Sequence, residues 1–187
     1  MPFAFPEGLA PEVYPLAWLV GRWRGEGVIE YTGVDETPFV HDLVFDHDGG
    51  PYLRFESTLR VRSAAAADGE GTDEAGDAPD TVWSTETGYW RVSTDRPDGL
   101  EDDRHALEVL VTDASGRLSL FLGVAGNGRI DLATDFVART STAAEVTAAK
   151  RLYGLVEGRL MWVEELAAFG HPLGSYASAQ LDRVDND

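Results

Sequence analysis

The feature that most constrains the fold of this chain is an alternation of apolar and polar residues with a period of two. Between residues 51 and 63 the apolar positions are Leu53, Phe55, Leu59 and Val61, and the polar positions are Arg54, Glu56, Thr58, Arg60 and Arg62. Successive side chains of a β-strand point to opposite faces, so this pattern predicts a strand with one buried face. The same alternation places Phe39, His41, Leu43 and Phe45 on one face of a second run, and Ile130, Leu132 and Phe136 on one face of a third.

Short turn sequences separate these runs. Asp48-Gly49-Gly50-Pro51 and Asn127-Gly128 are hairpin signals, because glycine and asparagine tolerate positive φ. The expected strands are 22–32, 38–47, 52–63, 81–93, 104–113, 117–125, 128–138, 145–154, 158–169 and 172–184. About ten strands with short connections predict an all-β fold, an antiparallel up-and-down β-barrel that closes on itself and can hold one ligand. A short helix over 11–20 is expected to cap one end.

The length of 187 residues fits a single domain spanning 1–187. One segment, 65–80, interrupts the strand pattern. It carries several carboxylates and no basic or aromatic residue, so it is expected to be a flexible acidic insertion.

Charge and composition exclude several functions. The formal net charge of -18 disfavours nucleic acid and anionic membrane surfaces as partners. The absence of cysteine excludes disulfides, cysteine-ligated zinc and iron–sulfur clusters. No stretch approaches the roughly 20 apolar residues that span a bilayer, and residues 1–10 do not resemble a signal peptide. The expected location is the cytoplasm.

The candidate polar sites are weak. His41 and His47 lie about 20 Å apart on an extended strand and cannot share a metal ion. The run that begins at Asp46 resembles the start of a calcium loop, but its twelfth position is Ser57 rather than glutamate, so a turn is expected. Glu164 and Glu165 are adjacent, face opposite sides of a strand and cannot act as a carboxylate pair. No metal site and no catalytic residues are predicted.

A glycine–tryptophan motif opens the first expected strand, with Gly21, Trp23, Gly25 and Gly27 at alternate positions on one face. The glycines remove side chains where a strand bends sharply into a barrel, and the tryptophan fills its closed end. In this place the motif resembles the nitrobindin family, and so do the segments 36–39, 86–91 and 151–153. Fatty-acid-binding barrels place two helices after the first strand, for which residues 33–37 are too few.

This resemblance implies a specific chemistry. Nitrobindins are ten-stranded barrels that bind ferric haem b through one histidine of the last strand. They bind nitric oxide and isomerise peroxynitrite to nitrate, and the open coordination position of the iron suits that reaction.

The last strand departs from the family pattern, because no histidine follows His171. Aligning Leu181 and Arg183 with the closing pattern places Tyr176, or alternatively Ser175, where the iron-binding histidine is expected. His171 is a less favoured ligand, since it lies about 16 Å from Tyr176 along an extended strand and at an odd offset. Tyr176 could bind iron only as a tyrosinate, which must first ionise.

Three hypotheses follow. The favoured one is a nitrobindin-like binding protein in which haem binding is lost or weak and a small apolar ligand is bound instead, so that no cofactor is required. The alternative is a functional ferric haem b protein that isomerises peroxynitrite through a ligand other than histidine. The third is a barrel whose interior is filled by side chains. The sequence leaves the oligomeric state open.

Overall fold

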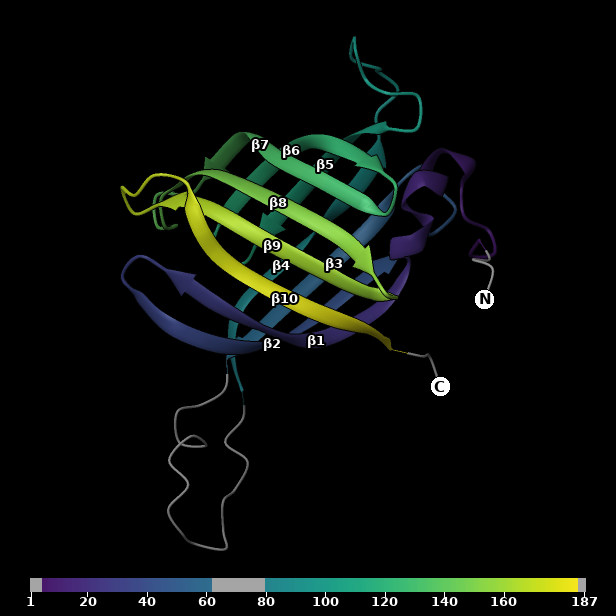
Figure 1. The fold of residues 1–187 in the computed structure, drawn as a ribbon. Coiled ribbons are helices and arrows are strands. Elements are labelled where there is room, and N and C mark those ends of the chain that lie inside the picture. The colour runs from purple at the N-terminus through teal and green to yellow at the C-terminus, as the bar shows by residue number, and fades with distance from the viewer. Residues whose placement is uncertain (1–4, 62–79, 185–187) are drawn as a thin grey trace, which may run out of the picture.

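The structure is a computed structural model that describes residues 5–61 and 80–184. Ten strands form a closed antiparallel barrel in which neighbours in sequence pair and β1 pairs with β10, which confirms the predicted fold (Figure 1). The strands are β1 Gly21–Tyr31, β2 Val34–Asp46, β3 Leu53–Val61, β4 Thr81–Val92, β5 His105–Asp113, β6 Arg117–Gly126, β7 Arg129–Arg139, β8 Val146–Val156, β9 Arg159–Ala168 and β10 Gly174–Val184. The insertion predicted at 65–80 lies outside the described residues except for Asp80, which is exposed.

The alternating pattern decides which face of each strand is buried. Leu53, Phe55 and Leu59 of β3 point inward, as do Ile130 and Leu132 of β7. The second strand is longer than predicted, because a two-residue turn ending in Gly33 (φ +83°) lets Val34 pair directly with Tyr31. No helix occupies this connection.

The prediction that Phe136 shares the buried face of β7 was wrong, since its side chain is 62% exposed. Leu120 pairs with Phe136 but its neighbour Phe121 pairs with Thr134, so Asp135 is an extra residue in β7. Such a β-bulge shifts the alternation by one position and turns the following side chain to the other face.

This bulge leads to a stability prediction. Phe136→Ser is expected to change the free energy of unfolding by no more than about 0.5 kcal/mol, because the ring already lies in water. Phe121→Ala, which removes a buried ring from the paired strand β6, is expected to lower it by about 3–5 kcal/mol. Urea denaturation of both variants measures the difference. A large loss for Phe136→Ser would contradict the bulge.

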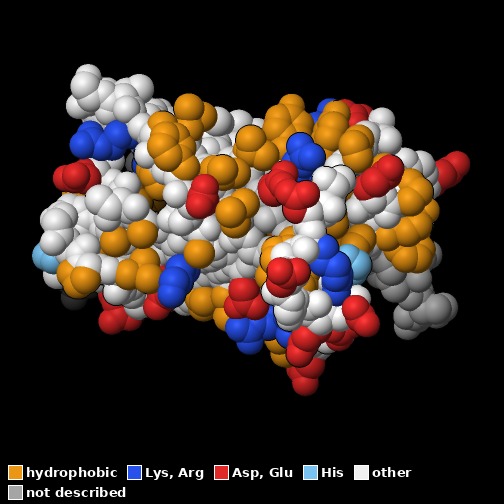
Figure 2. Space-filling model, turned by 90° about the horizontal axis from the view of Figure 1, so that it is seen from above, with side chains coloured by type: hydrophobic (Ala, Val, Ile, Leu, Met, Phe, Trp, Pro, Cys, Tyr) orange, Lys and Arg blue, Asp and Glu red, His pale blue; other side chains and the backbone are white. Residues whose placement is uncertain are grey.

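The outer face carries mixed side chains. Acidic side chains are spread over the face seen in Figure 2, with apolar ones among them, rather than gathered into one patch. The high negative charge is therefore not concentrated in one site on this face.

A 3₁₀ helix, η1 (Pro11–Leu19), covers one end of the barrel (Figure 1). Its apolar side chains join the core, and they are Val13, Leu16, Ala17 and Leu19. The buried Trp23 ring donates its Nε1–H to the Leu19 carbonyl oxygen at 2.7 Å, and the Arg183 guanidinium stacks on this ring at 4.2 Å. Arg183 also donates to the carbonyl oxygens of Trp18 and Val20. These contacts close this end, as predicted for the helix.

The glycines of the first strand allow β1 and β10 to approach closely. A Cβ atom on Gly25 would lie 2.0 Å from the Gln180 carbonyl oxygen, and one on Gly27 would lie 2.3 Å from that of Ser178. Because β1 and β10 form the seam that closes the barrel, side chains at these positions would push the seam apart.

Candidate functional site

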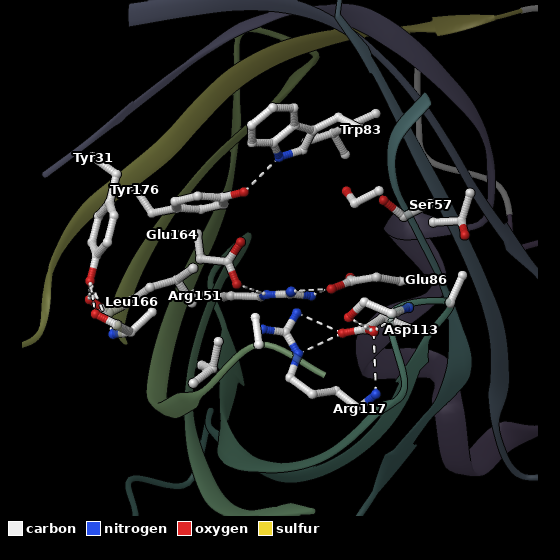
Figure 3. A pocket seen from close by; sticks show the side chains of 18 of the residues that line it. Tyr31, Ser57, Trp83, Glu86, Asp113, Arg117, Arg151, Glu164, Leu166 and Tyr176 are labelled. Carbon is white, nitrogen blue, oxygen red and sulfur yellow. Dashed lines mark hydrogen bonds and ion pairs between the residues drawn. The ribbon is translucent and has the colours of Figure 1, made fainter. Parts of the chain in front are cut away.

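A cavity of about 500 Å³ lies inside the barrel at the end opposite η1. Its lining includes Val34, Ser115 and Phe169, which belong to the β1–β2, β5–β6 and β9–β10 ends of the barrel. Most of the wall is apolar or aromatic, and it also carries charged side chains, which are Glu86, Asp113, Arg117, Arg151 and Glu164 (Figure 3). Side chains therefore do not fill this interior, contrary to the third hypothesis.

A buried ionic cluster crosses the lumen between three strands. Arg151 of β8 donates from Nη1 and Nη2 to the two carboxylate oxygens of Glu86 on β4, at 2.8 and 2.6 Å (Figure 3). Its Nε donates to Glu164 Oε1 on β9 at 2.8 Å. The guanidinium also lies 5.1 Å from the centre of the Phe121 ring.

The electrostatics of this cluster are set by burial and by the pairing. Burial lowers the pKa of Arg151 but the carboxylates of Glu164 and Glu86 outweigh it, so the net pKa lies well above the ordinary value. Burial raises the pKa of Glu164, and the charge of Arg151 opposes this only in part. Arg151 therefore stays protonated, while Glu164 is a carboxyl group whose ionised form is poorly solvated.

A second ion pair lies beside the cluster. Arg117 Nε donates to Asp113 Oδ2 at 2.6 Å, and the Ser115 amide donates to Asp113 Oδ1 at 2.9 Å. Burial raises the pKa of Asp113, but the hydrogen bonds from Ser115 and Arg117 together lower it. Asp113 is thus ionised and fully paired.

His41 is buried with both ring nitrogens occupied. Trp162 Nε1 lies 3.0 Å from His41 Nδ1, and an indole nitrogen can only donate, so Nδ1 is the acceptor. The proton of the neutral ring is therefore on Nε2, which donates to Ser57 Oγ at 2.8 Å. Burial, with help from the charge of Arg151, lowers the pKa of His41 to about 3, so the ring is neutral.

This tautomer excludes two functions for His41. A protonated Nε2 cannot accept the hydroxyl proton of Ser57, so the two side chains do not form a nucleophile–base pair. Neither nitrogen has a free lone pair for a metal ion. Among the described residues, no group of three or more histidine, aspartate or glutamate side chains is arranged to hold a metal.

The bulge in β10 determines which of its side chains enters the cavity. Ser175 pairs with Glu165 and Ala177 pairs with Glu164, which leaves Tyr176 as an extra residue between them. Tyr176 lines the cavity, whereas Ser175 is exposed and does not. Tyr176 Oη accepts a hydrogen bond of 2.8 Å from Trp83 Nε1, and its ring packs edge-on against Tyr31.

Of the remaining candidates from the sequence, Glu164 lines the cavity, whereas His171, Glu165 and Asp48 do not. His171 is exposed in the β9–β10 turn, outside the cavity lining, with its ring 6.2 Å from that of Tyr31. Glu164 faces inward and Glu165 outward, as expected for neighbours on a strand. Asp48 accepts from the Gly50 amide at 3.1 Å, which is the predicted turn.

Sequence reasoning missed the buried ion pairing of Glu86, Arg151 and Glu164. A usable signal was present, because each of the three is a charged residue at an inward-facing position of an expected strand. The pairing itself was not visible, since Arg151 and Glu86 are 65 residues apart in the chain.

No described helix has the length and apolar character needed to cross a membrane.

Comparison with known proteins identifies close relatives. Residues 12–183 match the family model described as the THAP4-like, heme-binding beta-barrel domain. The chain is 47% identical to a protein of Beutenbergia cavernae named ferric nitrobindin-like protein, with 98% of this chain and 100% of the relative covered. It is 38% identical to a protein of Clavibacter michiganensis subsp. michiganensis named peroxynitrite isomerase, with 96% and 98% covered. The crystal structure of Rv2717c from M. tuberculosis superposes with a TM-score of 0.73 at 26% identity, over 95% of this chain and 99% of that one.

Proposed function

The chain belongs to the family of THAP4-like, haem-binding β-barrel domains, and from that premise we propose that it is a small-molecule-binding barrel that has lost histidine-ligated haem. The observation that carries this proposal is that none of the four histidines, all of them described, offers a free ring nitrogen to the cavity. His41 uses both nitrogens, and His47, His105 and His171 lie outside the cavity lining.

Tyr176, the candidate ligand of the last strand that lines the cavity, is a poor substitute for imidazole. Burial raises the pKa of Tyr176, and the hydrogen bond from Trp83 lowers it only in part. The side chain is therefore a neutral phenol at physiological pH, and iron ligation would require it to ionise. The residues present do not fit an iron-ligated haem.

The cavity itself supports binding of an organic molecule. A volume of about 500 Å³ lies in the range of roughly 300–1,000 Å³ typical of ligand pockets. Its wall combines aromatic and aliphatic side chains with a few oriented polar groups, which is the usual construction of such a pocket. We therefore expect a small, largely apolar ligand in place of haem.

The alternative function is peroxynitrite isomerisation on a haem held by Tyr176. The relatives named peroxynitrite isomerase favour this alternative. A haemin titration followed by absorbance separates the two functions, because an iron-ligated haem gives a Soret band whose position reports its axial ligand.

The expected result is that the unmodified protein binds haemin weakly and without a histidine-type spectrum. Tyr176→His is expected to raise haemin affinity by at least about tenfold, or ~1.4 kcal/mol, because a neutral imidazole binds iron without an ionisation step. Tyr176→Phe is the matched control, since it keeps the ring and removes the oxygen.

Two results would contradict the proposal. Tight stoichiometric haem that is lost in Tyr176→Phe would establish tyrosinate ligation and favour the isomerase. Tight haem that is lost in His171→Ala would establish a ligand outside the cavity lining seen here.

A further inference from the structure

We propose that the cavity selects a hydrophobic molecule that carries a protonated amine, with the free carboxylate oxygen of Glu164 as the anchor for the amine. This inference rests on the proposed function, because it names the ligand class of the same cavity. It follows from the charge balance, from the position of one unpaired oxygen and from the aromatic wall.

The charged groups of the cavity do not cancel. Asp113 and Arg117 neutralise each other, with Nη2 of Arg117 2.6 Å from Asp113 Oδ2. Arg151 is shared between Glu86 and Glu164, at 2.6 and 2.8 Å. Among the lining residues that the structure describes, three carboxylates against two guanidinium groups leave one negative charge. An anionic ligand would meet this charge, and none of these described residues is a free cation that could offset it.

The unpaired charge is located on one atom. Both oxygens of Glu86 accept from Arg151, and both oxygens of Asp113 accept hydrogen bonds as well. Glu164 uses only Oε1, and within the described ranges its Oε2 has no hydrogen-bond partner. Figure 3 shows Oε2 directed away from Arg151 and toward the side of Tyr176 and Trp83.

The burial of this carboxylate makes the free oxygen significant. Only 8% of Glu164 is exposed, and its Oε2 is not among the fully buried side-chain atoms that lack a partner, so this oxygen opens onto the cavity. A buried charge that lacks a partner is unfavourable, and burial accordingly raises the pKa of this carboxyl group. An ammonium group that donates to Oε2 would supply the missing partner.

The aromatic part of the cavity wall suits a cation with an apolar body. Trp83, Tyr176, Tyr31 and Trp162 line the cavity, and aromatic faces attract ammonium groups as well as apolar surface. Tyr176 Oη already accepts from Trp83, so its own proton is available to a ligand atom that accepts. An amine next to an aromatic or aliphatic body therefore matches both parts of the cavity.

Calorimetric titration with three indole probes tests the inference. Tryptamine carries an ammonium group, tryptophol carries a neutral hydroxyl at the same place, and indole-3-propionate carries a carboxylate. Tryptamine is expected to bind at least about tenfold more tightly than tryptophol, and indole-3-propionate more weakly than both. The comparison uses the unmodified protein and does not depend on a variant that folds.

A pair of glutamine variants then locates the anchor. Glu164→Gln keeps the shape and the acceptor for Arg151 Nε, and it is expected to reduce tryptamine affinity by about tenfold and tryptophol affinity by clearly less, because only the ammonium loses an opposite charge. Glu165→Gln is the matched control, because it removes the same charge from the next residue of β9 on the exposed face. It is expected to leave both affinities unchanged.

The outcomes separate the two proposals. Equal affinity for tryptamine and tryptophol, or tighter binding of indole-3-propionate, would overturn the amine inference and leave the binding cavity standing. Equal losses of tryptamine affinity in Glu164→Gln and Glu165→Gln would show attraction by overall negative charge and would also overturn it. Failure of all three probes at millimolar concentration would overturn both the inference and the proposed function.

Discussion

Arg151→Leu is expected to lower the free energy of unfolding by about 3–5 kcal/mol at pH 8, as measured by urea denaturation. The arginine is 8% exposed and is the partner of two carboxylates whose side chains are 14% and 9% exposed. Removing it leaves both carboxylates in a poorly solvated interior without the guanidinium that pairs with them. Loss of one partner from a buried ion pair is among the largest effects of a single substitution.

The dependence of this loss on pH follows from the carboxylate that loses its partner. Burial raises the pKa of Glu164, and Arg151 lowers it, so the variant raises it further. The folded variant disfavours the ionised form of Glu164. The loss of free energy of unfolding is therefore complete above the raised pKa, and it shrinks at lower pH because Glu164 then binds a proton. The difference in free energy of unfolding between the unmodified protein and Arg151→Leu should therefore be smaller at pH 5 than at pH 8.

The control for this prediction is an exposed ion pair of the same kind. Arg129 and Asp131 are about half exposed, at 56% and 48%, so Arg129→Leu should change the free energy of unfolding by no more than ~1 kcal/mol. If Arg151→Leu has as small an effect as Arg129→Leu, water entering through the cavity solvates the carboxylates, and the cluster is not a buried one.

Gly25→Ala is expected to lower the free energy of unfolding by about 3 kcal/mol, the upper part of the usual range for overpacking. Its Cβ would lie 2.0 Å from the Gln180 carbonyl oxygen and 2.8 Å from Leu181 Cα. Both atoms belong to the backbone of β10, which cannot move away without lengthening the hydrogen bonds of the β1–β10 seam. Thermal or urea denaturation measures the loss.

Gly154→Ala provides the matched comparison on strand β8. No atom lies within 4 Å of a Cβ built at this position. Alanine restricts the unfolded chain more than glycine does, so this variant should be unchanged or more stable by up to ~1 kcal/mol. Equal losses at Gly25 and Gly154 would show that glycine flexibility, rather than close approach at the seam, determines the effect.

The fold could be predicted because its determinants are local. Alternation along a single strand, as between Leu53 and Leu59, is enough to identify a buried face, and glycine in short connections identifies hairpins. A closed barrel then follows from the number of strands and their sequential pairing. Phe136 was placed wrongly because the bulge before it arises from the pairing of β7 with β6. The residue pattern of one strand carries no information about that pairing.

The site was harder to predict because its parts come from distant strands. Arg151 and Glu86 meet across the lumen, and nothing in the sequence near either residue indicates the other. The tautomer of His41 depends on Trp162, which is 121 residues away along the chain. The departure of the last strand from the nitrobindin pattern could be recognised, because the absence of a histidine after His171 is read directly from the sequence.

The extra residue in β10 has an evolutionary consequence. It affects pairing with β9 only between Ser175 and Ala177, whereas pairing with β1 begins at Ala177 and continues to Val184. A deletion or insertion of one codon at 175–176 would therefore exchange the side chain that enters the lumen and leave the closing seam intact. Lineages of this barrel could in this way change their ligand chemistry by a single in-frame step.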